Sequence, residues 1–597
     1  MSRQRSEYPK EAMWDLEDFF ETQDDWESQF TELFNVAKEG WNKLMLFKGK
    51  AAVDAKTIKE LLTTYFEASR DLEKLYTYAH LRHDENVGED FFKNSFEKTL
   101  ALAYQFNQMS SWIEPEILKI DENLFKKYIT DPLLQPYKFF LERLYRQKEH
   151  VLSDEQEKII SMAARTQRTP RGAFSAFSNV DLQFPKIKNS KGEELQLTQG
   201  SYQVLMKSSD RTLRENAFKT LHSSFGSFEN TICELISGQV QNHVFTQKVR
   251  GYKSCLEASL KPHNIPTDVY LSLIETVRNN LDVLHHYVGV RKKVMGLETL
   301  KFWDMSVPLV SKCNMKFSYE EACDIVINSV APLGDEYQRI LKKGIKEDRW
   351  VDVYESKGKR TGAYSSGCYD SMPYILMNFQ GTLQDVLTLS HEAGHSMNSL
   401  LSNRDQVYHE AQYPIFIAEV ASTFNEQLTY EYLLEKAETK EEKLYILNQQ
   451  IDGMRATFFR QAMFAEFELK IHQFAENDIP LTPALLKEEY RKLNLDYFGS
   501  NLVIDEEVNW EFLRVPHFYY NFYVYQYATG IAAAVTLVDK VKQTNNKSYL
   551  EFLASGGSDY PINILKKAGV DMCSQEAVET LLKTFRSLME KFEKEIV

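Results

Sequence analysis

The sequence predicts a mainly α-helical protein, and three observations support this. Apolar residues recur at spacings of three and four through long windows such as Thr57 to Leu81, the pattern of a helix with one buried face. Proline is sparse, with 16 among 597 residues, which suits long helices. Hydrophobic residues make up 43% of the chain, enough for a sizeable core in more than one domain-sized unit.

Two segments break the helical pattern. In residues 181–199, short alternating runs flank the turn sequence NSKG, which predicts a β-hairpin. Residues 350–381 are rich in glycine, serine and tyrosine and contain β-prone pieces such as YILMNF. We therefore expect strands and loops immediately before residue 382, with helices through most of the remaining chain.

Charge and composition exclude several classes of protein. The net charge of −15 argues against a nucleic-acid partner or an anionic membrane surface, because either needs a basic footprint. The N-terminal residues contain no apolar core of a secretory signal, so we expect a cytoplasmic protein. The most apolar run, Ala528 to Val538, is too short to span a bilayer and predicts a buried core helix. No two of the six cysteines are spaced as CxxC, so neither a disulfide scaffold nor a cysteine zinc site is expected.

The segment HEAGH, from His391 to His395, carries the strongest chemical motif. On a helix, residues four apart lie on one face, so both imidazoles can bind one zinc ion. Glu392 projects close to the place of a water molecule on that zinc, where a general base is needed. Gly394 costs about 1 kcal/mol relative to alanine within a helix. That cost predicts a close approach by another part of the chain.

HExxH also occurs by chance, so a third ligand is needed to decide whether this is a metal site. Glu419 lies among apolar and small residues in FIAEVAS, where an acidic side chain is rarely buried unless it is paired or bound to metal. We therefore predict Glu419 as the third ligand. Glu410 is a rival in a polar loop. Glu426 follows seven residues after Glu419 on the same face, and is either a hydrogen-bond acceptor for a ligand histidine or a solvated charge.

A tyrosine-rich segment runs from Val515 to Gly530. His517, Tyr523 and Tyr527 have spacings that allow all three side chains to share one broad face. Phenol hydroxyl groups can stabilise an oxyanion without carrying charge, which predicts a catalytic role. The alternative is that these aromatic rings serve packing alone.

Together these segments resemble the M3 family of zinc metallopeptidases, and within it the oligoendopeptidase F group. The likeness rests on HEAGHSM, FIAEVASTFNE, HFYYNFYVYQYATG and the hairpin segment, and covers the chain from about the hairpin to the end. It implies a mainly helical, two-lobed metallopeptidase with a deep substrate channel and a small β-element beside the HExxH helix. We expect an N-terminal helical region at 1–175 and a catalytic region at 176–597, with the HExxH helix at 382–402.

The resemblance also implies roles for individual residues. His391, His395 and Glu419 correspond to the ligands of one zinc ion per chain, and Glu392 to the catalytic base. The histidine and tyrosines between Val515 and Gly530 correspond to residues that face the substrate, with Tyr520 an alternative to Tyr523 and Tyr527. Asn398 departs from the family pattern, in which many relatives carry histidine, and this puts any substrate contact at that position in doubt.

The predicted activity is hydrolysis of internal bonds in short unstructured oligopeptides. Glu392 accepts a proton from the zinc water, hydroxide attacks the peptide carbonyl, and Glu392 returns the proton to the leaving amine. The alternatives are a zinc aminopeptidase, for which we identify no set of acidic residues to bind a free amine, and a non-catalytic helical peptide-binding protein. The intact Glu392 argues against the second alternative, because a structural zinc needs no base. The oligomeric state is not predicted.

Overall fold

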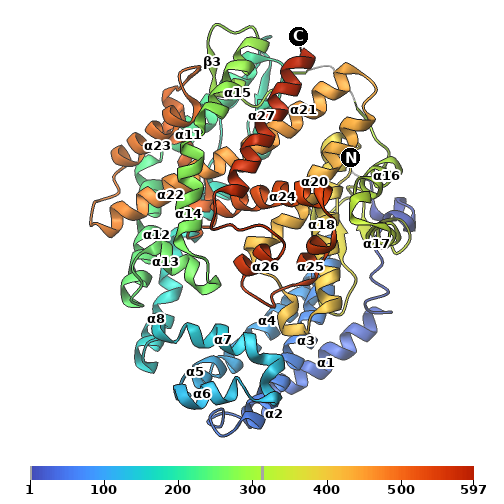
Figure 1. The fold of residues 1–597 in the computed structure, drawn as a ribbon, viewed down its shortest axis with the longest axis vertical. Helices are drawn as coiled ribbons and strands as arrows, with labels where there is room; N and C mark the ends of the chain where they lie inside the picture. The colour runs from blue at the N-terminus through green and yellow to red at the C-terminus, as the bar shows by residue number, and fades with distance from the viewer. Residues whose placement is uncertain (1–2, 311–312, 314, 597) are drawn as a thin grey trace. The chain divides into compact units, whose positions relative to one another are not determined.

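Helices account for most of the chain in the computed structural model, which describes residues 3–310, 313 and 315–596 (Figure 1). This confirms the predicted fold class. Contacts divide the chain into two compact units, each assembled from three segments. Unit 1 comprises Met1–Glu149, Met315–Tyr432 and Leu537–Gly569, and unit 2 comprises His150–Asn314, Leu433–Thr536 and Val570–Val597. The expected regions at 1–175 and 176–597 divide the chain differently and stay a prediction.

Unit 1 contains the helix with the histidine motif. The helices that lie wholly or mostly in this unit are α1 (Gln23–Lys38), α2 (Asn42–Met45), α3 (Ala55–Glu85), α4 (Asp90–Ser110), α5 (Ile113–Leu118), α6 (Glu122–Tyr128), α7 (Lys138–Arg146), α16 (Tyr319–Ser329), α17 (Asp335–Lys346), α18 (Leu383–Asp405), α19 (Tyr408–Ala411), α20 (Ile415–Lys436), α25 (Lys547–Ala554) and α26 (Pro561–Lys567). Its strands are β4 (Val351–Asp352), β5 (Tyr364–Ser366) and β6 (Tyr374–Leu376). The long helices α3 and α4 pack side by side (Figure 1).

Unit 2 contains the predicted hairpin and the tyrosine-rich segment. Its helices are α8 (Asp154–Gln167), α9 (Thr169–Ala176), α10 (Gln199–Met206), α11 (Arg211–Gly226), α12 (Glu229–Val249), α13 (Cys255–Leu260), α14 (Thr267–Arg278), α15 (Leu281–Val294), α21 (Lys440–Met454), α22 (Arg460–Glu476), α23 (Pro483–Phe498), most of α24 (Tyr525–Gln543), and α27 (Glu576–Ile596). Its strands are β1 (Lys186–Lys188), β2 (Glu194–Gln196), β3 (Leu300–Lys301) and β7 (Leu502–Val503). Strands β1 and β2 pair antiparallel across the NSKG turn, which confirms the hairpin.

A small sheet lies beside the motif helix in unit 1. Its strand order is β4-β6-β5, with β6 parallel to β4 and antiparallel to β5. Strands β5 and β6 both pack against α18, and the Ser365 hydroxyl on β5 lies 2.8 Å from the Ser396 hydroxyl on α18. The predicted β-element beside the HExxH helix is therefore confirmed.

Helix α18 begins and ends close to the predicted bounds. The Thr382 side chain accepts a hydrogen bond from the backbone N–H of Asp385, whose carboxylate in turn accepts from the Thr382 N–H, so a capping box fixes the start. One face of the helix buries Leu389, Ala393 and Met397 completely. The helix packs against α16 and α25 within the same unit (Figure 1).

The apolar run in Ala528 to Val538 lies within α24, and these residues are buried. This confirms the prediction of a core helix. Among the described residues, no helix combines the length and the apolar character needed to cross a membrane.

Helices α18 and α20 approach each other closely at Gly394. A Cβ atom on this residue would lie 2.6 Å from the carbonyl oxygen of Ala421 and 2.7 Å from the Cα of Ser422. Both neighbours are backbone atoms of α20, so no side-chain rotation relieves the clash. The close approach that the mid-helix glycine predicts is therefore present.

We expect Gly394→Ala to destabilise the protein even though alanine favours helix formation. The added methyl group forces α18 and α20 apart, at a cost on the order of 1–3 kcal/mol for overpacking. The measurement is the thermal unfolding midpoint. Gly172→Ala is the matched control, because Gly172 also lies within a helix but an added Cβ there meets no atom within 4 Å.

The control should leave the midpoint unchanged or raise it, because alanine is the better helix former. If both substitutions raise the midpoint equally, α18 and α20 do not require the glycine.

Candidate metal centre and aromatic cluster

The two motif histidines lie on the one open side of their helix segment. Between residues 389 and 398, only His391 and His395 are partly exposed, and every other residue is buried. Their ring centroids are 4.8 Å apart and their planes meet at 80°. Both imidazoles are therefore available to a common ligand from the same side of α18.

Glu419 on α20 completes a three-residue cluster with these histidines. Its Oε2 atom lies 3.4 Å from Nε2 of His391 and 3.6 Å from Nε2 of His395. A tetrahedral zinc with bonds of roughly 2.0–2.1 Å to nitrogen and oxygen places its ligand atoms about 3.3–3.4 Å apart. The donor types and the spacing thus fit a zinc ion.

No other such group of three or more His, Cys, Asp or Glu side chains is found in the described part of the chain. Glu410, the rival ligand, is not part of the cluster, and its neighbouring charge is that of Arg143. The structure thus brings together the three residues that the sequence predicts as ligands.

Glu426 holds the His391 ring in place. Its Oε1 atom makes a short hydrogen bond with Nδ1 of His391, one of the two roles the sequence leaves open for it. In the neutral ring, a carboxylate that accepts the Nδ1 proton makes Nε2, the atom that points at Glu419, the nitrogen that can bind a metal. Burial alone would lower the pKa of His391, but Glu426, with added charge from Glu392 and Glu419, raises it to about 9.

Glu419, the predicted third ligand, has a firmly ionised carboxylate. Burial would raise the pKa of Glu419, but hydrogen bonding to His395 and the charges of both histidines lower it to about 2. The Ser422 hydroxyl donates a further hydrogen bond of 3.1 Å to Oε2. The Glu419 carboxylate therefore stays ionised, the form in which a carboxylate binds a metal ion.

Glu392 is buried beside the cluster, with 7% of its surface exposed. Burial raises the pKa of its carboxyl, while the charges of His391 and His395 and the backbone N–H of Ser365 lower it. Burial prevails, so Glu392 binds a proton more readily than an exposed glutamate does. That property suits a residue that accepts and later returns a proton.

Asn398 is also buried, and it lies near the connection between α19 and α20. Its side-chain amide helps to lower the pKa of Tyr413, which burial raises. The Tyr413 hydroxyl lies 2.9 Å from the hydroxyl of Ser399. Asn398 therefore interacts with a tyrosine six residues before Glu419, and it is not one of the three converging side chains.

In unit 2, four aromatic side chains from the tyrosine-rich segment form one cluster. The ring centroid of His517 lies 5.9 Å from the ring centroid of Tyr523, 5.7 Å from that of Tyr527 and 5.7 Å from that of Tyr520. The Tyr527 hydroxyl is 3.4 Å from Nε2 of His517. Burial lowers the pKa of His517, which favours its neutral form. The three residues predicted to share a face are therefore neighbours, with Tyr520 beside them.

This cluster does not arise from one continuous helix. His517 lies in the 3-10 helix η11 (Pro516–Tyr519), and Tyr527 lies in α24. Between these elements, Asn521 and Phe522 both adopt left-handed backbone conformations with φ of 54° and 56°. A residue other than glycine seldom adopts this conformation, so the turn depends on its surroundings.

The residue that holds this turn was not predicted from the sequence. Glu468 on α22 is fully buried, and its Oε1 atom accepts a hydrogen bond of 2.6 Å from the backbone N–H of Phe522. Burial raises the pKa of Glu468 to about 8. The sequence signal is an acidic residue within FAEFELK, among buried side chains. Its partner lies 54 residues away, beyond the reach of periodicity arguments.

Comparisons with known proteins agree with this geometry. Residues 204–584 match Peptidase family M3, and residues 116–184 match a domain described as Oligopeptidase F. The chain is 42% identical over 593 residues to Oligopeptidase PepF of Bacillus subtilis, covering 99% of this chain and 88% of that protein. It is 36% identical over 602 residues to the plasmid oligoendopeptidase F of Lactococcus lactis subsp. cremoris, covering 100% and 99%.

Solved structures show the same relationship. A crystal structure of a peptidase from Chlamydophila abortus superposes with a TM-score of 0.93 at 37% identity, and each chain is covered completely. Oligoendopeptidase-F from Enterococcus faecium superposes with a TM-score of 0.75 at 32% identity, covering 96% of this chain and 99% of that one. Since the family match spans more than half of the chain and full-length relatives exceed 30% identity, the chain belongs to peptidase family M3, a family of metallopeptidases.

Proposed function

We propose that this metalloendopeptidase is zinc-dependent and cleaves internal bonds of short unstructured oligopeptides. The observation that carries the proposal is the convergence of His391, His395 and Glu419, with Glu392 buried beside them. The ligand spacing supports one zinc ion per chain, and the names of the relatives support oligopeptides as substrates.

In the proposed mechanism, His391, His395 and Glu419 hold the metal, and Glu426 orients His391. When bound, zinc supplies Lewis acidity, which acidifies water and polarises the peptide carbonyl. Glu392 accepts the proton of the attacking water at its carboxylate. It then gives that proton to the nitrogen of the leaving amine. No residue of the chain forms a covalent bond with the substrate.

The aromatic cluster has a second role in the proposal. Tyr527 or Tyr523 donates a phenolic hydrogen bond to the oxyanion that develops on the carbonyl, and His517 is the remaining candidate donor. A neutral donor suits this task because it adds no charge to the ground state. The buried, neutral form of His517 and the mutual contacts of the rings support a preorganised arrangement.

The proposal also includes the cellular compartment and the binding partners of the protein. Four buried thiols fit the reducing cytoplasm, namely those of Cys233, Cys255, Cys323 and Cys368. The net charge of −15 supports peptides and not nucleic acids as partners. The two other functions considered are an aminopeptidase, which requires a free substrate amine, and a non-catalytic peptide-binding protein.

The digestion of a peptide library tests the function directly. We expect internal cleavage of short peptides, whether the N-terminus is blocked or free, with no attack on a stable folded domain in the same mixture. A chelator should abolish the cleavage and added zinc should restore it. The products are measured by mass spectrometry. Release of single N-terminal residues alone would indicate an aminopeptidase, and zinc content without turnover would indicate a binding protein.

A second prediction concerns the third ligand. Glu419→Ala removes one of three donors, so we expect the purified variant to contain far less than one zinc per chain by metal analysis. Glu410→Ala is the control, because it removes a nearby carboxylate that lies outside the cluster. Full zinc occupancy in Glu419→Ala would place the third ligand elsewhere.

A third prediction separates the base from the ligands. Glu392→Gln has similar size and retains hydrogen-bonding ability but cannot accept the proton. We expect zinc content to stay normal while kcat falls by roughly 100- to 10,000-fold, the range for loss of a general base. Near-normal turnover would disprove the proposed mechanism and leave the metal site intact.

A fourth prediction tests the aromatic cluster. Removal of the hydroxyl in Tyr523→Phe or Tyr527→Phe should lower kcat by roughly 10- to 1,000-fold with little effect on KM, because the contact strengthens in the transition state. Tyr519→Phe is the control, since the Tyr519 ring lies outside the cluster and stacks on Phe174. If both variants behave like the control, the cluster serves packing alone.

A further inference from the structure

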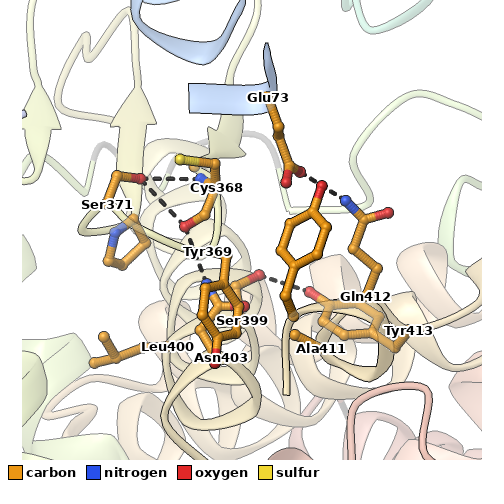
Figure 2. A pocket seen from close by; sticks show the side chains of 13 residues that line it. Glu73, Cys368, Tyr369, Ser371, Ser399, Leu400, Asn403, Ala411, Gln412 and Tyr413 are labelled. Carbon is orange, nitrogen blue, oxygen red and sulfur yellow. Dashed lines mark hydrogen bonds between the residues drawn. The ribbon is translucent and has the colours of Figure 1, made fainter. Parts of the chain in front are cut away.

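A second feature of unit 1 is a cavity of about 210 Å³ next to the motif helix (Figure 2). It is lined by α3, by the loop between β5 and β6, by α18, by α19, and by the segment that joins α19 to α20. Ser399, one of its lining residues, lies one helical turn after His395. The volume is smaller than the roughly 300–1,000 Å³ of sites that enclose a drug-sized ligand, so it suits one side chain.

The cavity also lies close to Glu419, the proposed ligand on α20. Tyr413 lines it and is hydrogen-bonded to Ser399. The charge of Glu419 contributes to the raised pKa of Tyr413, after the larger effect of burial. The cavity and the cluster of His391, His395 and Glu419 are therefore neighbours along the same face of α18.

Three tyrosine side chains line this cavity, and their hydroxyl groups are already engaged. The Tyr369 hydroxyl donates to the carbonyl of Gln406 at 2.9 Å. The Tyr408 hydroxyl lies 3.1 Å from the hydroxyl of Ser69, and that of Tyr413 is bonded to Ser399. The Arg70 guanidinium already lies over the Tyr369 ring, 4.6 Å from its centroid. What remains for a ligand is chiefly the ring surface of Tyr408 and Tyr413, and the negative face of an aromatic ring attracts cations.

Glu73 of α3 brings to the cavity a carboxyl group that has no positively charged partner among the described residues. Its Oε1 atom accepts a hydrogen bond of 2.6 Å from the Gln412 amide, and Figure 2 shows this bond. Its Oε2 atom is buried and has no hydrogen-bond partner of normal geometry among the described residues. Burial raises the pKa of Glu73, and the contacts with Gln412 and Tyr408 offset this only in part.

The other ionisable groups near Glu73 do not neutralise it. Asp370 is held by Arg70 through two hydrogen bonds, so that guanidinium is committed elsewhere. Burial raises the pKa of the Cys368 thiol to about 11, so it stays neutral. No ion pair of Glu73 occurs among the residues that the structure describes. Glu73 is half-buried, but its Oε2 atom is buried and unpaired, which is costly. A cation from outside offsets that cost.

We propose that this cavity binds the cationic side chain, lysine or arginine, of a peptide substrate, with Glu73 as the counter-charge and the three tyrosines as its walls. The inference rests on the proposed peptidase function and adds a preference for one type of side chain at one substrate position. An apolar side chain in the same place would leave Oε2 of Glu73 unpaired, which is costly for a buried acceptor.

The test starts from a peptide that the protein cleaves, blocked at both ends. In a set of variants of this peptide, each position in turn carries lysine, arginine, norleucine or glutamate. At one position we expect kcat/KM to be roughly 10- to 100-fold higher for lysine or arginine than for norleucine, and lowest for glutamate. Glu73→Gln should bring the lysine-to-norleucine ratio close to one while leaving turnover of the norleucine peptide within about threefold of wild type. Glu73→Asp should restore part of the preference.

Glu67→Gln is the matched control, because it removes an equal charge from an exposed site on the same helix. Binding is measured separately by calorimetry with the Glu392→Gln protein. The lysine peptide should bind more tightly than the norleucine peptide, and the added Glu73→Gln substitution should remove this difference.

Three results would overturn the proposal. The first is that no position of the peptide shows a preference for lysine or arginine. The second is that the preference survives in Glu73→Gln. The third is that Glu67→Gln loses the preference equally, which would mean that it depends on the total charge of the protein and not on Glu73. In each case cleavage by the wild-type protein and its loss in Glu392→Gln would still support the proposed function. Lack of any peptide cleavage would count against the proposed function itself, while the calorimetric comparison would still test the cavity.

Discussion

Helices α18 and α20 meet at Gly394 so closely that no side chain fits between their backbones. The contact point adjoins His395 on one helix and lies two residues after Glu419 on the other, at Ala421. Short interhelical distances let a glutamate reach two imidazoles on a neighbouring helix. The cluster of His391, His395 and Glu419 thus depends on a glycine at position 394, although glycine is a poor helix former. Metal binding to this cluster would in turn stabilise the pair of helices.

The site brings three carboxyl groups together around two histidines. Glu392, Glu419 and Glu426 lie around His391 and His395. Burial pushes the pKa of Glu392 upward while the histidines hold that of Glu419 down. The pKa values of two neighbouring carboxyl groups are thereby shifted in opposite directions, as the proposed roles of a cation ligand and a proton acceptor require.

Unit 2 positions its aromatic cluster through buried polar groups. Glu468 holds the left-handed turn through the N–H of Phe522, and the Phe522 ring lies 4.4 Å from that of His472. Nδ1 of His472 donates to the carbonyl of Glu468, so its Nε2 accepts from Nδ1 of His243. Burial lowers the pKa of both histidines, which remain neutral near pH 7. Both ring nitrogens of His472 are therefore hydrogen-bonded, and a neutral polar network of this kind rigidifies its surroundings.

The sequence by itself determined the helical fold class, the hairpin, and the placement of His391 and His395 on one face, because helical periodicity and turn chemistry act over a few residues. It also identified Glu419, since a lone carboxylate in an apolar helix needs a partner. The tertiary structure alone decided that Glu426 contacts His391 and that Glu73 faces a tyrosine-lined cavity. Those contacts join residues 35 or more positions apart, and their distances depend on how helices pack, which no local pattern records.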